Sequence, residues 1–137
     1  MKFIALTGLA LGFFVSAAAA KTYTYSCTIK ASGNAGWIAS NMAFRHDTTG
    51  KGVTVFDPVS MHYNSGKPVD GMVSVENAKR ITFKWETSGK DRSGQYAPKL
   101  LYRATYIKKS AQMHVSMTPA GYQNGFQGRG SCEIKQG

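Results

Sequence analysis

Polar and apolar residues alternate along residues 22–30, which read TYTYSCTIK. Every second position from Thr22 to Lys30 is polar, and the positions between them hold tyrosine, cysteine or isoleucine. Successive side chains of a β-strand point to opposite faces, so this pattern predicts a strand with one buried and one exposed face. Threonine and tyrosine are favoured on pleated surfaces. Cys27 lies on the predicted buried face.

Similar alternation recurs down to the carboxyl terminus, with turn residues between the segments. Three of these segments have a clear predicted inner face. It holds Ile81, Phe83 and Trp85 in residues 80–87, and Met113, Val115 and Met117 in residues 112–118. In residues 131–135 it holds Cys132 and Ile134. For residues 100–109 the pattern does not decide which of two alternating sets faces inward. One set is Tyr102, Ala104 and Tyr106, and the other is Arg103, Thr105 and Ile107. The other predicted strands are 37–46, 52–57 and 69–76, together with a short, weak one at 60–64. In 37–46, Ile38, Met42 and Phe44 share one face.

Seven to nine short strands without a long amphipathic helix predict an all-β protein. A single open sheet of this length would leave two exposed edges, which pairing of the first and last strands would remove. The sequence therefore favours a small antiparallel up-and-down β-barrel. A two-sheet β-sandwich is the alternative.

The amino terminus has the pattern of a secretory signal peptide. Lys2 precedes an apolar run, and the segment ends in small residues at Ala18, Ala19 and Ala20. We expect residues 1–20 to be removed and residues 21–137 to form a single β-barrel domain, periplasmic or secreted and not membrane-spanning after cleavage. A retained apolar anchor is the alternative.

The two cysteines of the chain, Cys27 and Cys132, stand near the two ends of the expected domain. An exported protein meets an oxidising environment, so we expect these residues to form a disulfide that joins the first and last strands. Closing a loop of ~100 residues contributes about 4.7 kcal/mol in the chain-entropy treatment. Two free thiols are the alternative.

The chain is basic, with 17 Lys+Arg against 7 Asp+Glu and a formal net charge of +10. Loss of residues 1–20 would remove one lysine, Lys2, and leave +9. A field of this sign attracts anions in general, so an anionic envelope or surface component is a possible partner, as is a protein, and the charge also serves solubility. We expect no nucleic-acid partner, since the basic and aromatic residues of 99–109 alternate between opposite faces.

The segment 119–132, PAGYQNGFQGRGSC, combines glycines with aromatic residues before the last predicted strand. The favoured interpretation is structural: glycine permits bulges and close backbone approach, and Tyr122 and Phe126 cover the open end of the barrel. The alternative is functional, with Tyr122, Phe126 and Arg129 as a candidate binding loop, since loops on rigid β scaffolds often bind ligands.

Residues with catalytic or metal-binding chemistry form no recognisable motif. His46, His62 and His114 lie far apart without metal-ligand spacing, and the sequence lacks a G-x-S-x-G nucleophile motif and a phosphate-binding loop. An enzyme of this sequence would need a histidine and a carboxylate to meet in one cleft. We therefore predict no catalytic residues, no metal, no cofactor and no enzymatic activity.

Four features resemble the small periplasmic inhibitors of C-type lysozyme. These are Y-x-C at Tyr25–Cys27, SGQY at 93–96, KKSA at 108–111 and a late cysteine, Cys132. The resemblance implies a barrel and inhibitor function. The chain departs from that pattern, because SGQY is one residue shorter than S-G-x-x-Y and Lys109 replaces a glycine. A basic chain would also repel a basic lysozyme.

These observations predict an exported, non-catalytic β-barrel binding protein for an anionic surface component or a protein partner. The first alternative is a barrel with an internal cavity for a small apolar ligand, motivated by the many tyrosine, phenylalanine and methionine residues. The second is a periplasmic inhibitor-type protein.

Overall fold

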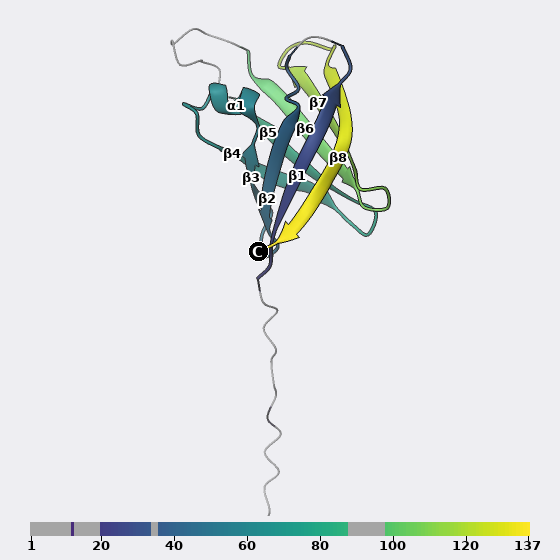
Figure 1. The fold of residues 1–137 in the computed structure, drawn as a ribbon. Coiled ribbons are helices and arrows are strands. Elements are labelled where there is room, and N and C mark those ends of the chain that lie inside the picture. Colours follow the sequence, from purple (N-terminus) through teal and green to yellow (C-terminus); the bar gives the residue numbers. More distant parts are fainter. Residues whose placement is uncertain (1–11, 13–19, 34–35, 88–97) are drawn as a thin grey trace, which may run out of the picture.

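The structure, a computed structural model, describes residue 12 and residues 20–33, 36–87 and 98–137. It is a closed barrel of eight antiparallel strands, each paired with its neighbour in sequence, in which β8 returns to pair with β1 (Figure 1). The predicted all-β up-and-down barrel is confirmed, and the two-sheet sandwich is wrong. The expected signal peptide lies almost wholly outside the described residues. The elements are β1 (Thr22–Ala31), β2 (Asn41–Asp47), β3 (Gly52–Phe56), α1 (Pro58–His62), β4 (Val69–Glu76), β5 (Arg80–Glu86), β6 (Leu100–Ile107), β7 (Gln112–Pro119) and β8 (Phe126–Gln136).

Large side chains fill the inside of the barrel. Phe44 and Phe83 are fully buried and stack with their ring centroids 5.0 Å apart. Trp85 and Tyr102 stack in the same way at 5.1 Å. The open question about β6 is thereby settled, because Tyr102, Ala104 and Tyr106 point inward. A filled interior is typical of barrels with eight strands.

The short strand predicted at 60–64 is wrong, because the chain forms α1 there. Asp57 accepts hydrogen bonds from the backbone N–H groups of Val59 and Ser60, and Pro58 occupies the first turn. Aspartate at the N-cap followed by proline is a strong helix start. The Asp57-Pro58 pair ends strand β3, as expected, and it also begins a helix.

Strands β1 and β8 close the barrel and carry the disulfide. Their register runs from Tyr23 opposite Gln136 to Ala31 opposite Gly128, and it places Cys27 directly opposite Cys132. The two sulfur atoms are bonded at 2.06 Å. The predicted Cys27–Cys132 disulfide is confirmed.

The last strand begins earlier than predicted and leaves the barrel at its far end. Gly128 and Gly130 lie inside β8 rather than before it. Beyond Ser131, which pairs with Gln112, β8 has no β7 partner and pairs with β1 alone. The prediction that Ile134 is buried is therefore wrong, since Ile134 is 42% exposed on this protruding ladder.

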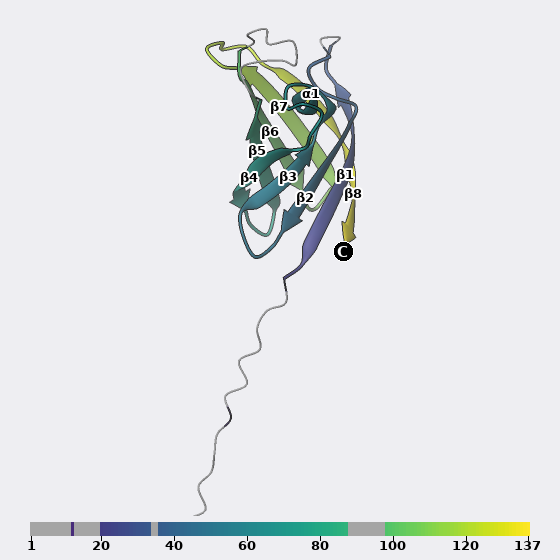
Figure 2. The same cartoon turned by 90° about the vertical axis from the view of Figure 1, so that its left-hand side faces the viewer.

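The two ends of the barrel differ. Short hairpins at 48–51, 77–79 and 108–111 join the strands at one end, which we call the hairpin end. At the other end the strands are joined by longer connections, of which 57–68 contains α1 and 120–125 precedes β8 (Figure 2); the other two, 32–40 and 87–99, are described only in part. We call this second end the mouth. No helix among the described residues has the length and apolar character needed to cross a membrane.

Candidate functional site

Aromatic side chains from separate segments surround one hollow at the mouth. Its volume is about 400 Å³, and most of its lining is apolar. The ring-bearing residues come from the β1–β2 connection, the residue after α1, the β7–β8 connection and the first residue of β8. The lining residues are Trp37, Tyr63, Pro98, Leu100, Pro119, Tyr122, Asn124 and Phe126.

Trp37 is held over the barrel by a hydrogen bond from the core. The hydroxyl of Tyr102 donates to the carbonyl oxygen of Trp37 at 2.8 Å. Burial raises the pKa of Tyr102 well above the usual tyrosine range, so this donor keeps its proton at physiological pH. The next residue, Ile38, is buried in the core, and the Trp37 ring lies 6.5 Å from the Phe126 ring at a tilt of 44°. The hydrogen bond therefore fixes the backbone of Trp37, and its side chain packs against the core and Phe126.

A buried polar network fixes α1 and so the position of Tyr63. The indole Nε1 of Trp85 donates to the Ser60 hydroxyl at 2.9 Å, and that hydroxyl donates to a carboxyl oxygen of Asp57 at 2.5 Å. Ser60 and Asp57 are fully buried. Burial raises the pKa of Asp57, although three hydrogen-bond donors from Ser60 and Val59 oppose that shift. Tyr63 follows as the C-cap of α1, and its backbone N–H bonds to the Ser60 carbonyl oxygen at 3.2 Å.

A second hollow of about 440 Å³ adjoins the first. It shares Trp37 and Tyr63 with the first hollow and is completed by Gly36, Val59 and His62, together with Pro58. The His62 and Tyr63 rings meet edge to face at 5.2 Å. Trp37 and Tyr63 thus line both hollows.

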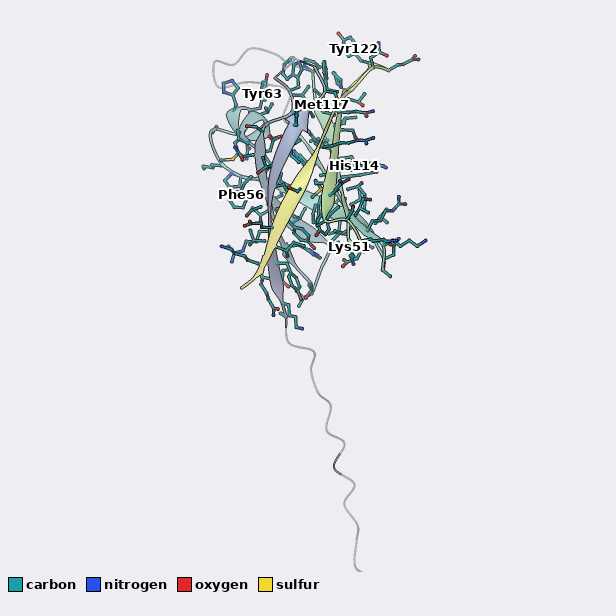
Figure 3. All side chains as sticks on the ribbon, turned by 45° about the vertical axis from the view of Figure 1, so that its right-hand side comes forward. Lys51, Phe56, Tyr63, His114, Met117 and Tyr122 are labelled. Carbon is teal, nitrogen blue, oxygen red and sulfur yellow. A yellow bond between two sulfur atoms is a disulfide. The ribbon has the colours of Figure 1, made fainter. Side chains whose placement is uncertain are left out.

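Tyr122 stands at the outer edge of the mouth. Its backbone N–H donates to the Pro119 carbonyl oxygen at 3.0 Å, and Gly121 has a φ of +86°. A positive φ at the third residue is the mark of a type II turn and favours glycine there. The Tyr122 side chain is 66% exposed. Figure 3 shows Tyr63 and Tyr122 at the same end of the barrel and Lys51 away from them.

The structure brings together two of the three residues of the candidate binding loop. Tyr122 and Phe126 line the same hollow, and Phe126 also packs against the core. Arg129 lies on the outer wall of β8, exposed, and its register partners on β1 and β7 are Lys30 and His114. Tyr122 does not cover the barrel end as the structural interpretation expected, since two thirds of its side chain meets solvent.

Trp37 and Tyr63 are the mouth residues that the sequence reasoning missed. Trp37 was placed at the start of a strand, and Tyr63 in the short strand that proved to be α1. One signal was available for Trp37: it follows a glycine-rich turn and precedes Ile38, the first inward residue of its segment. No signal in the sequence shows that Tyr63 lines the same hollow as Trp37, because only α1 and its buried network place Tyr63 there.

The three histidines lie in different parts of the described structure. Ser60 and Asp57 make a hydroxyl–carboxylate pair, but both are sealed from solvent. His46 is buried, with Nε2 3.0 Å from the carbonyl oxygen of Gly50 at the hairpin end, whereas His62 lies at the mouth and His114 on the wall of β7. Within the described part of the chain, no three His, Cys, Asp or Glu side chains are grouped as a metal ion would require.

The outer wall carries a larger but different hollow. It has a volume of about 680 Å³ and crosses strands β4 to β7, where charged residues such as Lys84 and Arg103 alternate with Met72 and Leu101. Regular strands alone form it, without a loop or an exposed aromatic ring. The mouth is therefore the better candidate, since pockets that bind are mostly apolar and often lie at the mouths of β-barrels.

Comparisons of the chain with protein-family models, with curated proteins and with solved structures find no match. Of the residues that resemble the lysozyme inhibitors, Tyr25 and Cys27 lie in β1 and Lys108 lies in the hairpin after β6, whereas 93–96 lies outside the described residues.

Proposed function

We propose that this protein is an exported, non-catalytic binding protein that holds an apolar side chain or short apolar segment of a partner protein in its mouth. The single observation that carries this proposal is the convergence of Trp37, Tyr63, Tyr122 and Phe126 on one hollow. Tyrosine and tryptophan are enriched among the residues that dominate the energy of protein interfaces.

The rigidity of the mouth supports the same function. Trp37 is tied to the core through Tyr102, and Tyr63 follows a helix that Asp57 and Ser60 anchor. Aromatic side chains that are already positioned lose little conformational freedom when a partner binds. We expect Tyr122, which is the most exposed of the four, to adjust its rotamer on binding.

A displayed random peptide library, selected against the folded protein, tests the proposal. We expect selected peptides to share an apolar or aromatic anchor and to bind Tyr122→Ser at least tenfold more weakly, because an aromatic hot-spot residue contributes about 2 kcal/mol or more. Phe56→Ser is the matched control, because Phe56 is a 37% exposed aromatic residue of strand β3 that does not line the hollow. Peptides that bind Tyr122→Ser and the native protein equally would contradict the proposal.

A small apolar ligand in the same hollow is the second candidate function. The volume of about 400 Å³ lies within the range of small-molecule sites, and the lining is apolar. Titration with an apolar fluorescent dye separates the two. Micromolar dye binding that Tyr122→Ser abolishes, together with failure to select any peptide, would favour the small ligand.

A further inference from the structure

Five cations gather on the short hairpins at the end of the barrel opposite the mouth. They stand on three successive hairpins, where all are exposed: Lys51, Lys79, Arg80, Lys108 and Lys109. We call this set the basic pole. The Lys108 N–H donates to the Lys79 carbonyl oxygen at 3.0 Å, which joins two of the hairpins, and the Val73 N–H of β4 donates to the Lys51 carbonyl oxygen at 2.7 Å.

Local geometry brings Lys79, Arg80 and Lys108 of the basic pole together. The Asn77 side chain accepts hydrogen bonds from the backbone N–H groups of Lys79 and Arg80 at 2.9 and 3.0 Å, which fixes the tight turn after β4. The next hairpin is joined to it directly through Lys108 and Lys79. Crowding of like charges opposes folding, so contact with an anionic surface would relieve the repulsion within the basic pole.

None of the ion pairs recorded among the described residues involves the basic pole. Among the residues that the structure describes, the recorded ion pair is Lys99–Glu86, at the mouth end. Asp47 and Glu76 are the carboxylates on the strands that lead into these hairpins. Asp47 is occupied locally, because it accepts hydrogen bonds from the backbone N–H and hydroxyl of Thr49 at 2.9 and 2.8 Å, and these bonds lower its pKa.

The shape of this end selects among anionic partners. Its cations stand on projecting hairpins. The hollow described at this end has a volume of about 200 Å³, and Lys51 is the one cation of the basic pole that lines it, together with Glu76. A small anion would need a concave site with converging donors. Lysine side chains on a projecting surface fit a plane of phosphate groups, and clusters of four or more cations are typical of proteins that bind anionic lipid surfaces.

We propose that the basic pole docks this protein on an anionic phospholipid membrane surface. The mouth, near α1, is at the opposite end of the barrel from the hairpins (Figure 1), so a docked molecule presents the mouth away from the lipid. Trp37 and Tyr122 line that mouth. The binding is electrostatic and reversible, with no inserted segment. This inference does not depend on the function proposed for the mouth.

Vesicle co-sedimentation tests the proposal on the protein purified from the compartment to which it is exported. The probes are vesicles of phosphatidylcholine and phosphatidylglycerol at 3:1 and vesicles of phosphatidylcholine alone. We expect binding to the anionic vesicles only, and loss of that binding as salt rises from 0.05 to 0.5 M, because the screening length falls from above ~10 Å toward ~3 Å.

Two quadruple variants separate the pole from the net charge. The pole variant is K79Q/R80Q/K108Q/K109Q, and the wall variant, K30Q/K84Q/R103Q/R129Q, changes the charge equally on exposed strand positions. Each cation at an anionic surface is worth about fivefold in affinity, so the pole variant should bind more than ~100-fold more weakly. We expect the wall variant to lose less than ~10-fold. Circular dichroism of both variants checks that each is folded.

Several results would overturn the proposal. One is equal loss of vesicle binding in the pole and wall variants, which would mean that net charge alone acts. Another is binding to a soluble polyanion such as heparin without binding to the vesicles. A third is vesicle binding that disappears in Tyr122→Ser and persists in the pole variant, which would place the membrane at the mouth. Failure of peptide selection at the mouth leaves all of these readouts unchanged.

Discussion

Replacing Gly130 with alanine tests how tightly β8 is packed against β1. A Cβ atom at this position would lie only 1.7 Å from the carbonyl oxygen of Thr28 and 2.9 Å from the Cα of Ile29. Non-bonded heavy atoms normally approach to about 3.5 Å, so the two strands would have to separate by roughly 1.5–2 Å. Both obstructing atoms belong to the backbone, so no side-chain rotation relieves the clash.

The cost follows from what the separation breaks. Overpacking alone typically costs about 1–3 kcal/mol. Loss of one or two hydrogen bonds between β1 and β8 adds about 1 kcal/mol each. We therefore expect the free energy of unfolding of Gly130→Ala to fall by about 3 kcal/mol or more.

Gly52→Ala is the matched control for this change. Gly52 is also a strand glycine, in β3, and a Cβ there would meet nothing within 4 Å. Alanine for glycine at a compatible backbone position stabilises by about 0.4–1 kcal/mol through the unfolded state. Both variants keep Cys27 and Cys132, so the disulfide contributes equally.

Urea unfolding of the oxidised proteins, followed by tryptophan fluorescence, measures both changes. Equal m-values would show that the compactness of the native and unfolded states is unchanged. A Gly130→Ala variant within about 0.5 kcal/mol of the native protein, alongside a normal Gly52→Ala variant, would refute the packing explanation for this glycine.

Three further predictions follow from the same structure. The Cys27→Ala/Cys132→Ala protein should lose about 4–5 kcal/mol of unfolding free energy for a loop of ~100 residues, and a loss below about 1 kcal/mol in urea titrations would contradict the chain-entropy estimate. Tyr102→Phe should lose about 1 kcal/mol and weaken peptide binding at the mouth, because the carbonyl oxygen of Trp37 loses its donor; unchanged stability and affinity would disprove the anchoring role. Burial raises the pKa of Tyr25 to about 12, so the stability that this group contributes below its unfolded pKa of about 10 is lost as pH rises toward 12. Between pH 9 and 11.5 that loss is about 2 kcal/mol, and Tyr25→Phe should remove it from urea midpoints measured across this range; a Tyr25→Phe protein with the native pH dependence would contradict the assignment.

Alternation predicted most of the fold, because one face of every strand meets a filled interior. The inward-facing residues that were predicted for β5 and β7 follow from the alternation of polar and apolar positions alone. Closure of the sheet followed from the two cysteines, whose bond requires the first and last strands to be neighbours. Helix α1 was missed because the pair Asp57-Pro58, which ends a strand, is also a helix start. A helix of about one turn is also too short to show the helical spacing of apolar residues.

The candidate site was predicted only in part. Tyr122 and Phe126 stood out as aromatic residues within a glycine-rich segment, and both line the mouth. Arg129 was grouped with them because β8 was taken to begin later than it does. With Phe126 as the first strand residue, alternation alone sends position 129 to the outer wall. Trp37 and Tyr63 come to line the same hollow through tertiary structure, which a local sequence pattern does not record.

The position of the mouth depends on the register of β8. A slip of one residue would turn every side chain of the strand to the other face. Gln127 and Arg129 would then enter the apolar interior, Phe126 would leave the mouth, and Cys132 would no longer oppose Cys27. Gly128 adds a steric condition, because a Cβ there would lie 2.8 Å from Ile29 and 3.0 Å from Ile38. The disulfide and the two glycines of β8 thus select the one register that places Phe126 beside Trp37, so the same segment closes the barrel and completes the mouth.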